Sequence, residues 1–282
     1  MEWRCGQFTF TFPRPALVMG ILNVTPDSFS DGGRFHEPAA AVERAHQMIS
    51  EGADLLDVGG ESTRPGAVAV EEKEELRRVL PVLERLVGQV SIPISIDTQK
   101  ANVAEQALKA GVSVVNDVGT SGDRSALWPL VAEYRAGYVA MHMQGTPQTM
   151  QSAPRYRDVI TEVSEFFRER LTSLESAGVS SQQVVLDPGI GFGKSLDHNL
   201  ELIAQVDRFL PFGRPVLLGV SRKSFLGRLL GTELGERLPG GLACTAWAAL
   251  RGVQLFRTHD VAATVQLVRT LESLAARVPP VP

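Results

Sequence analysis

The chain has 282 residues, a hydrophobic fraction of 44% and a formal net charge of -4, which leaves no basic footprint for nucleic acid. Its apolar runs are far shorter than the roughly 20 residues that span a bilayer, and the first residues lack the apolar core of a signal peptide. The two cysteines, Cys5 and Cys244, form no metal-type spacing, so we expect a reduced, cytoplasmic protein. These observations favour a small-molecule enzyme.

Short apolar runs alternate with stretches of helical periodicity along the chain. Alternation around aromatic positions at 3–12 predicts a short hairpin. After it, eight strands are expected, at 16–22, 54–58, 92–97, 112–116, 138–143, 184–186, 216–220 and 253–256. The helices expected between and after them lie at 38–50, 71–86, 100–110, 126–134, 156–177, 197–209, 224–230, 239–251 and 262–276.

Alternating strands and helices predict a parallel sheet, because parallel neighbours need a long crossover connection. Eight such units predict an α/β fold of the (β/α)8 TIM-barrel type, with the short N-terminal β-hairpin placed to plug the barrel bottom. We expect a single domain over 1–282, with the barrel over about 16–277. In such a barrel the active site lies at the carboxyl ends of the strands.

Polar residues stand where several of these strands end. One aspartate at such a place is often only a helix cap, but three strand-end residues and a lysine together favour a ligand site: Asp97, Asn116, Asp187 and Lys223. Two carboxylates, an amide and an ammonium group suit a flat heteroaromatic ring with alternating donors and acceptors. Met141 and Phe192 would supply apolar faces for the ring, although core packing is the commoner role of both types.

Two loops that follow strands, at 23–37 and 61–70, exceed the usual 2–6 residues and predict functional lids. The second loop carries Arg64, and arginine is the preferred planar clamp for anions. The glycine-rich segment DPGIGFGK at 187–194 matches neither the P-loop nor the dinucleotide fingerprint. Its glycines instead indicate a close approach of the backbone to a ligand.

The ends of the seventh and eighth strands predict an anion site. In TIM barrels these two strand ends often hold phosphate, and here they carry 221–224 (SRKS) and Arg257 with His259. The residues expected around a polyanionic leaving group are Asn23, Arg64, Arg257 and His259. His142 also ends a strand, but the sequence offers no partner for it.

The strand-end segments together resemble the dihydropteroate synthases, from about residue 16 to the last helix. The segments that carry the resemblance are NVTPDSFSDGG, ESTRPG, SIDT, VVND, MHMQGTP, DPGIGFGK, SRKS and RTHDV. The resemblance implies a transferase that joins 6-hydroxymethyl-7,8-dihydropterin diphosphate to 4-aminobenzoate, releases diphosphate and gives 7,8-dihydropteroate in folate biosynthesis. It also implies a Mg²⁺ cofactor and a homodimer.

The resemblance assigns roles to residues of this sequence. With Met141 added from the reasoning above, the expected pterin site is Asp97, Asn116, Met141, Asp187, Phe192 and Lys223. The residues expected to bound the aminobenzoate are Thr63, Pro65, Phe192 and Ser221. The residues expected to handle the diphosphate are Asn23, Arg64, Arg257 and His259, with Asn23 as the Mg²⁺ ligand. The groups expected to act in catalysis are Asp97, Lys223, Arg257 and Arg64.

Three other functions stay open at this stage. A methyltransferase domain that binds methyltetrahydrofolate would share the acidic and amide floor, but it would have little use for the long loops or the anion site. A catalytically silent pterin-binding paralogue should show damage in those loops or anion residues, and we find none. A phosphate-binding barrel for sugars would not need Asp97, Asn116 and Asp187 together.

Overall fold

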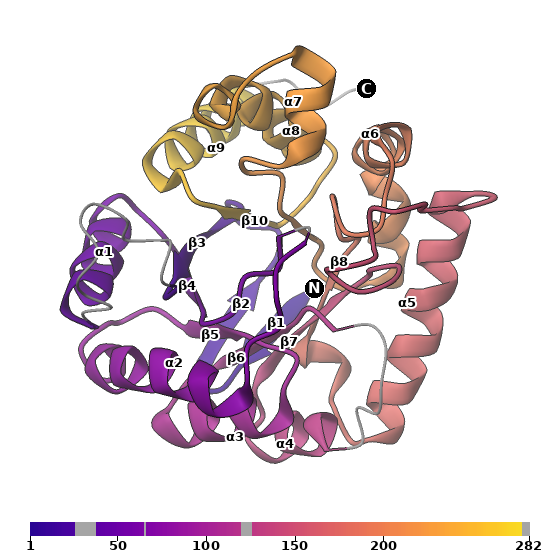
Figure 1. Ribbon diagram of the computed structural model, residues 1–282. Helices are drawn as coiled ribbons and strands as arrows, with labels where there is room; N and C mark the ends of the chain where they lie inside the picture. Colours follow the sequence, from indigo (N-terminus) through magenta and orange to yellow (C-terminus); the bar gives the residue numbers. More distant parts are fainter. Residues whose placement is uncertain (26–37, 65, 120–125, 278–282) are drawn as a thin grey trace.

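The computed structural model describes residues 1–25, 38–64, 66–119 and 126–277. Within these ranges, eight parallel strands surround a central axis and helices cover them on the outside (Figure 1). The barrel strands are β3 (Leu17–Asn23), β4 (Leu55–Gly59), β5 (Ile94–Asp97), β6 (Val114–Asp117), β7 (Gly137–Met141), β8 (Val184–Asp187), β9 (Leu217–Leu218) and β10 (Leu255–Thr258). The predicted (β/α)8 fold is confirmed.

The barrel closes between the two strands at the ends of the hydrogen-bonded sheet. The strand order is β8-β7-β6-β5-β4-β3-β10-β9. A parallel bridge between Leu186 and Val216 then joins β8 to β9. β9 is shorter than predicted at both ends: the Val216 N–H donates to the side chain of Gln254 (2.8 Å), and the pairing with β10 does not continue past Leu218. All eight carboxyl ends therefore point to the same rim.

The helices that follow the strands agree closely with the predicted ranges. They are α1 (Pro38–Ser50), α2 (Glu72–Leu86), α3 (Ala101–Ala110), α4 (Leu127–Glu133), α5 (Val159–Ser176), α6 (Leu196–Ala204), α7 (Ser224–Leu230), α8 (Leu238–Leu250) and α9 (Val261–Ala275). Helix α5 begins later than predicted, because the carboxylate of Asp158 caps it by accepting from the Thr161 N–H (2.8 Å).

The single helix predicted over 197–209 is wrong in its second half. Helix α6 ends at Ala204, and the chain continues as the 3-10 helix η3 (Val206–Phe212). Pro211 lies in this segment, and proline disfavours α-helical backbone at the residue before it. Two further 3-10 helices in the described ranges are η2 (Ser181–Gln183) and η4 (Leu234–Glu236).

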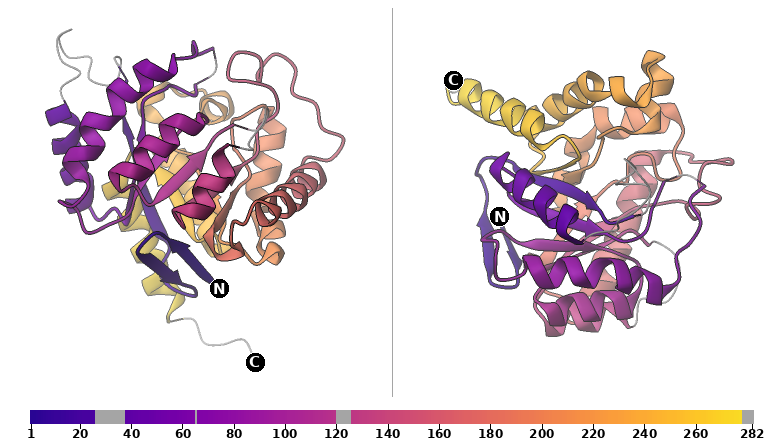
Figure 2. Two further views of the ribbon diagram at one scale, coloured as in Figure 1. Left: turned by 90° about the horizontal axis from the view of Figure 1, so that it is seen from below. Right: turned by 60° about the vertical axis from the view of Figure 1, so that its left-hand side comes forward.

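The N-terminal hairpin closes the end of the barrel opposite to the strand carboxyl ends (Figure 2). Strands β1 (Glu2–Cys5) and β2 (Phe8–Thr11) pair antiparallel, as predicted. Trp3 is fully buried and its Nε1 donates to the Gln183 carbonyl (3.1 Å). Hairpin side chains pack in one cluster with side chains from inside the barrel: Trp3, Cys5, Phe12, Leu17, Met19, Leu55, Val114, Val139, Val185, Leu217 and Leu255.

A larger apolar cluster lies between the strands and the surrounding helices. It packs around the barrel from outside, while the hairpin fills one end, which leaves the carboxyl end for a ligand. Among the helices of the described ranges, none combines the length and the hydropathy needed to cross a bilayer.

Candidate active site

A cavity of about 390 Å³ opens at the carboxyl ends of the barrel strands. Each of the eight strands, or the loop that follows it, contributes to its wall. The structure brings together every predicted site residue that it describes: Asn23, Thr63, Arg64, Asp97, Asn116, Met141, Asp187, Phe192, Ser221, Lys223, Arg257 and His259. Pro65 and most of the first long loop, 26–37, lie outside the described residues.

Arg257 is the centre of a charged network on the cavity floor. Its Nε donates to Oδ2 of Asp57 (2.6 Å) and its Nη2 donates to Oδ2 of Asp97 (2.7 Å). The Asn116 amide donates to the same Asp57 oxygen (3.0 Å). Residues from β10, β4, β5 and β6 therefore form one connected set beneath the cavity.

Asp57 is a member of this network that the sequence analysis did not identify. It lies inside β4, between Leu56 and Val58, and its side chain is fully buried. A carboxylate inside an apolar strand is the signal that could have identified it, because a buried charge requires a partner. Its role as the shared acceptor for Arg257 and Asn116 became visible only with the closed barrel.

Burial makes Asp97 a weaker acid than an exposed aspartate. Burial raises the pKa of Asp97 to about 7; Arg257 opposes this shift, while Asp57 and Glu75 add to it. Among the described residues, the buried Oδ1 atoms of Asp57 and Asp97 accept no hydrogen bond. The Asp97 carboxylate thus has one oxygen on Arg257 and one buried oxygen without a partner among the described residues.

Asp187, Lys223 and Phe192 form a second group across the cavity. Asp187 ends β8 and its Oδ1 accepts from the Gly189 N–H (2.8 Å). Burial raises the pKa of Asp187, although this hydrogen bond and Lys223 oppose the shift. The Lys223 ammonium lies 3.9 Å from the Phe192 ring centroid, and burial lowers its pKa to about 8. A carboxylate and an ammonium group therefore stand beside an aromatic face.

The carboxyl ends of β9 and β10 meet through Ser221 and His259. Ser221 Oγ lies 3.0 Å from Nδ1 of His259, and the His259 N–H donates to Ser221 Oγ (3.2 Å). Burial, together with Arg257 and Arg222, lowers the pKa of His259 to about 3. His259 is therefore neutral near pH 7. The positive charge at this edge comes from the arginines, so a role of His259 toward an anion would be hydrogen bonding.

The second long loop is held at both of its ends. Glu61 accepts from the Val70 N–H (2.9 Å) and from Lys100 Nζ (2.6 Å), which ties the loop ends to each other and to the start of α3. The Gly66 N–H donates to the Pro147 carbonyl (3.0 Å). These contacts place Thr63 and Arg64 on the cavity wall.

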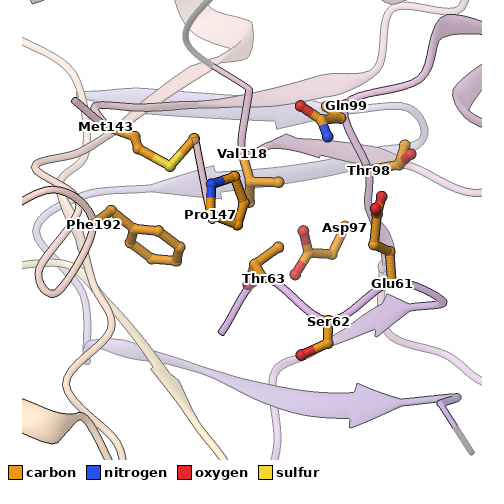
Figure 3. Close-up of a pocket in the computed structure, with 10 residues that line it drawn as sticks. All are labelled: Glu61, Ser62, Thr63, Asp97, Thr98, Gln99, Val118, Met143, Pro147 and Phe192. Carbon is orange, nitrogen blue, oxygen red and sulfur yellow. The ribbon is translucent and has the colours of Figure 1, made fainter. Parts of the chain in front are cut away.

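A small side pocket of about 10 Å³ adjoins the cavity beneath this loop (Figure 3). Phe192 and Met143 lie on one side of it, and Glu61 and Thr98 lie on the opposite side, with Asp97 between. Asp97 and Phe192 also line the main cavity, so the apolar and acidic walls continue from one space to the other.

The described residues contain no group of three or more His, Cys, Asp or Glu side chains suited to a metal ion. Mg²⁺, however, commonly takes only one or two protein oxygens and completes its shell with water and substrate phosphate. Asn23 offers such an oxygen on the cavity wall. The space above Gly59 lies within 4 Å of Asn23 Oδ1 and Asp97 Oδ2, but the Asp97 oxygen already accepts from Arg257 Nη2, which leaves the Asn23 oxygen for an ion. The donor set fits a substrate-dependent Mg²⁺ and not a fixed all-protein site.

Comparison with known proteins agrees with this geometry. A family described as pterin binding enzyme matches residues 19–259. Dihydropteroate synthase from Escherichia coli strain K12 is 47% identical over 256 residues, which cover 91% of this chain and 90% of the relative. Dihydropteroate synthase from Xanthomonas albilineans, solved with 4-aminobenzoic acid, has a TM-score of 0.90 and 46% identity over 99% of each chain.

The same Xanthomonas albilineans enzyme has also been solved in complex with 7,8-dihydropteroate. That structure has a TM-score of 0.87 and 43% identity, and the match covers 99% of this chain and all of the other. The chain therefore belongs to the pterin-binding enzyme family and, within it, to the dihydropteroate synthases, transferases of folate biosynthesis.

Proposed function

We propose that this chain condenses 6-hydroxymethyl-7,8-dihydropterin diphosphate with 4-aminobenzoate, releasing diphosphate and forming 7,8-dihydropteroate. The observation that carries the proposal is the single cavity into which Asp97, Asn116, Asp187, Lys223 and Arg257 all face. Relatives solved with 4-aminobenzoic acid and with 7,8-dihydropteroate support the choice of substrates.

The pterin ring is proposed to lie across the cavity floor. A ring amidine or lactam edge presents parallel N–H donors, which a carboxylate accepts in pairs. Asp187 and the unpartnered oxygen of Asp97 supply such acceptors. The Asn116 amide supplies both a donor and an acceptor. Lys223 would donate to the ring carbonyl. Met141 and Phe192 would cover the two faces of the ring.

The diphosphate is proposed to lie toward the ends of β10 and β3. The groups available there are Asn23, Arg64, Arg257 and His259. Mg²⁺, held by Asn23, would neutralise charge on the diphosphate and so improve it as a leaving group. Arg257 and Arg64 would contribute the same kind of stabilisation from the protein, while neutral His259 would donate a hydrogen bond.

We propose a dissociative path for the reaction itself. The exocyclic C–O bond breaks first, diphosphate carries away the electron pair, and the pterin delocalises the positive charge that remains. The carboxylate of Asp97 stabilises this charge. The amine of 4-aminobenzoate, bounded by Thr63, Pro65, Phe192 and Ser221, then forms the C–N bond and releases a proton. An aniline nitrogen is unprotonated at neutral pH, so no strong general base is required.

We also propose that the chain acts as a homodimer. Six large apolar side chains are exposed along α7, η4 and α8, and they lie close together in sequence: Leu229, Leu230, Leu234, Leu238, Trp247 and Leu250. Helix α8 (LPGGLACTAWAAL) carries no charged residue, although Trp247 is 46% and Leu250 69% exposed. A helix that is apolar on an outward face needs a partner.

We infer that 1–282 acts as one pterin-binding domain, since the matched family region 19–259 spans the barrel. We also infer a cytoplasmic location, which the free cysteines Cys5 and Cys244 support, because thiols persist in reducing compartments.

The test is to mix the purified chain with pterin diphosphate, 4-aminobenzoate and Mg²⁺ and to follow diphosphate release and 7,8-dihydropteroate formation. The proposal predicts release of one diphosphate for each dihydropteroate formed when both substrates are present. Because the C–O bond breaks before the amine attacks, omission of the amine should abolish dihydropteroate formation without abolishing diphosphate release. Pterin binding without product would instead identify a silent pterin-binding paralogue. Failure to bind pterin would overturn the proposal altogether.

A further inference from the structure

The last residue of the glycine-rich segment 187–194 is a buried lysine, Lys194, which does not line the cavity. The side chain of Lys194 is 1% exposed, and no carboxylate of the described residues lies within ion-pair distance of it. Its Nζ instead contacts Nδ1 of His142 (3.0 Å), the His142 carbonyl (3.3 Å) and the Phe192 carbonyl (3.0 Å). An ammonium group has three donors, and these three acceptors satisfy all of them.

His142 is shaped to serve as one of these acceptors. Its ring is 8% exposed and packs edge-on against Phe166, with ring centroids 5.0 Å apart. Burial, and then the charge of Lys194, lowers the pKa of His142 to about 2, so its ring stays neutral. A neutral imidazole can present a lone pair at Nδ1 to Lys194 and carry its proton at Nε2. The histidine for which the sequence offered no partner therefore has one, 52 residues along the chain.

The same backbone groups fix the position of Asp187. The His142 N–H donates to the Asp187 carbonyl (3.0 Å), and the Gly189 N–H donates to the Asp187 carboxylate (2.8 Å). The Phe192 N–H donates to the Gly189 carbonyl (3.1 Å). Because Lys194 donates to the Phe192 carbonyl, these hydrogen bonds connect Asp187 with Lys194. Gly189 has φ of 69°, and a Cβ there would lie 1.8 Å from the His142 carbonyl oxygen. The loop therefore cannot shift relative to His142 while these contacts last.

Other carbonyls of the loop are held by uncharged side chains. The Tyr156 hydroxyl donates to the Gly193 carbonyl (2.9 Å), and Gln151 donates to the Gly191 carbonyl (2.8 Å). Lys194 differs from both in two ways. Burial lowers its pKa to about 7, so it carries a positive charge on the acidic side of that pH, and it holds Phe192 itself. Tyr156 thus provides a comparison for the loss of one hydrogen bond from the same loop without any change in charge.

We propose that Lys194 is a positioning residue for the pterin site: its buried ammonium group holds the carbonyls of His142 and Phe192 together, and so sets the place of the Phe192 ring and of the Asp187 carboxylate. The inference rests on the proposed function, because it assigns Asp187 and Phe192 to the pterin. It adds a residue that contacts no substrate and acts through two that do.

The charge of Lys194 also acts on the ionisation of Asp187. Three cations face this carboxylate, and each lowers its pKa against the effect of burial: Lys223, Arg257 and Lys194. Removal of the Lys194 charge should therefore raise the pKa of Asp187. If pterin binding requires ionised Asp187, the variant without the Lys194 charge should begin to lose affinity at a higher pH than the wild type does as the pH falls. Loosening of the loop alone would not move that pH.

The test compares Lys194→Met with Tyr156→Phe, by calorimetric titration of 6-hydroxymethylpterin across pH 5 to 9. We expect Lys194→Met to weaken pterin binding by about 10- to 100-fold, as for other losses of positioning groups, and to move the acidic limb of the binding profile to higher pH. Tyr156→Phe should stay within about threefold of the wild type, with an unmoved profile, since it loses a single uncharged hydrogen bond.

The outcomes separate this inference from the proposed function. Absence of pterin binding by the wild type would overturn the proposed function. Normal wild-type binding, with Lys194→Met resembling Tyr156→Phe in affinity and in pH profile, would overturn the role of Lys194. Where Lys194→Met does not fold by circular dichroism, Lys194→Gln replaces it, because its amide can still donate to the Phe192 carbonyl but carries no charge. A wild-type profile for the glutamine variant would equally contradict the inference.

Discussion

Arg257 and Asp97 form an ion pair at the centre of the cavity floor, with 2.7 Å between Nη2 and Oδ2. The two residues come from strands that are 160 positions apart along the chain. Our proposal assigns Asp97 to the pterin and Arg257 to the diphosphate. The ion pair therefore connects the pterin site, where positive charge develops on the ring, with the diphosphate site, where the leaving group carries negative charge away.

Replacement of Arg257 by alanine should damage both stability and binding. The change strips Asp57 and Asp97 of their shared cation, and loss of one member of a buried charged set costs about 3–5 kcal/mol of unfolding free energy. The diphosphate substrate should lose more affinity than the pterin alcohol, which carries no phosphate. Urea denaturation and calorimetry measure the two effects.

Arg222→Ala, which removes a more exposed pair with Asp260, is the control and should cost no more than about 1 kcal/mol of stability. Equal affinity losses for both ligands would show that Arg257 does not bind the diphosphate.

Asp57→Asn should reduce pterin affinity although Asp57 is buried beneath the proposed ring contacts. The asparagine keeps the shape of the side chain but removes the charged acceptor that Arg257 and Asn116 share. A hydrogen bond to a charged group contributes roughly 1.5–3 kcal/mol, so we expect a loss of about tenfold or more. Asp54→Asn is a matched control, because Asp54 precedes the same strand but pairs with Arg269 at the other end of the barrel. If pterin binds both variants as tightly as it binds the wild type, Asp57 has no part in the site.

The affinity for 6-hydroxymethylpterin should pass through a maximum between pH 7 and pH 8. Burial raises the pKa of Asp97 to about 7, so the carboxylate that accepts from the ring becomes protonated, and affinity falls, as the pH drops below 7. Burial lowers the pKa of Lys223 to about 8, so its ammonium group is lost, and affinity falls, as the pH rises above 8. Calorimetric titration over this range measures both limbs. Asp97→Asn should leave only the part of the acidic limb that the ionisation of Asp187 sets, and Lys223→Met should remove the alkaline limb. A profile that stays flat in the wild type would rule out these two ionisations as determinants of binding.

Asn23→Ala should raise the Mg²⁺ concentration needed for half-maximal diphosphate release by about tenfold. The effect is modest because water and phosphate supply the other ligands of the ion. Affinity for the pterin alcohol without Mg²⁺ should remain at the wild-type value, because the ring contacts lie elsewhere. Asn102→Ala removes an exposed amide that donates to Glu72 and serves as control. An unchanged Mg²⁺ requirement in Asn23→Ala would remove Asn23 from the metal site.

Leu250→Glu should convert a dimer into monomers without unfolding the chain. Leu250 is 69% exposed on the uncharged helix α8, so a charge there costs little in the monomer but is buried in the proposed interface. Leu274→Glu is the matched control, because Leu274 is 58% exposed on α9, outside the α7–α8 surface. Analytical ultracentrifugation reports the masses. A monomeric wild type, or a Leu250→Glu variant that stays dimeric, would contradict the proposed interface.

Much of the fold was predictable from the sequence because its signals are local. Apolar runs of strand length alternate with helical periodicity, and Asp97, Asn116 and Asp187 stand at strand ends where a barrel gathers them. The helix that changes to 3-10 geometry after Ala204 was not predicted, because its periodicity continues to Phe209 although the backbone conformation changes.

The pairing of charges within the site was not predictable in the same way. Asp57 lies in the middle of an apolar strand, and its partner Arg257 is 200 positions away. In the sequence, Lys194 is the last residue of a glycine-rich segment, and it is the fold that places it against His142. Sequence patterns indicate which residues face the ligand, whereas the partners that hold them come from packing between distant strands.

The most direct measurement is a crystal structure of the chain with 6-hydroxymethylpterin bound. We predict a single pterin in the cavity at the strand carboxyl ends, stacked on Phe192, with its N–H edge on Asp187 and Asp97 and with Asn116 and Lys223 within hydrogen-bond distance. A pterin bound elsewhere on the barrel, or one in this cavity that contacts none of these four polar side chains, would contradict the account.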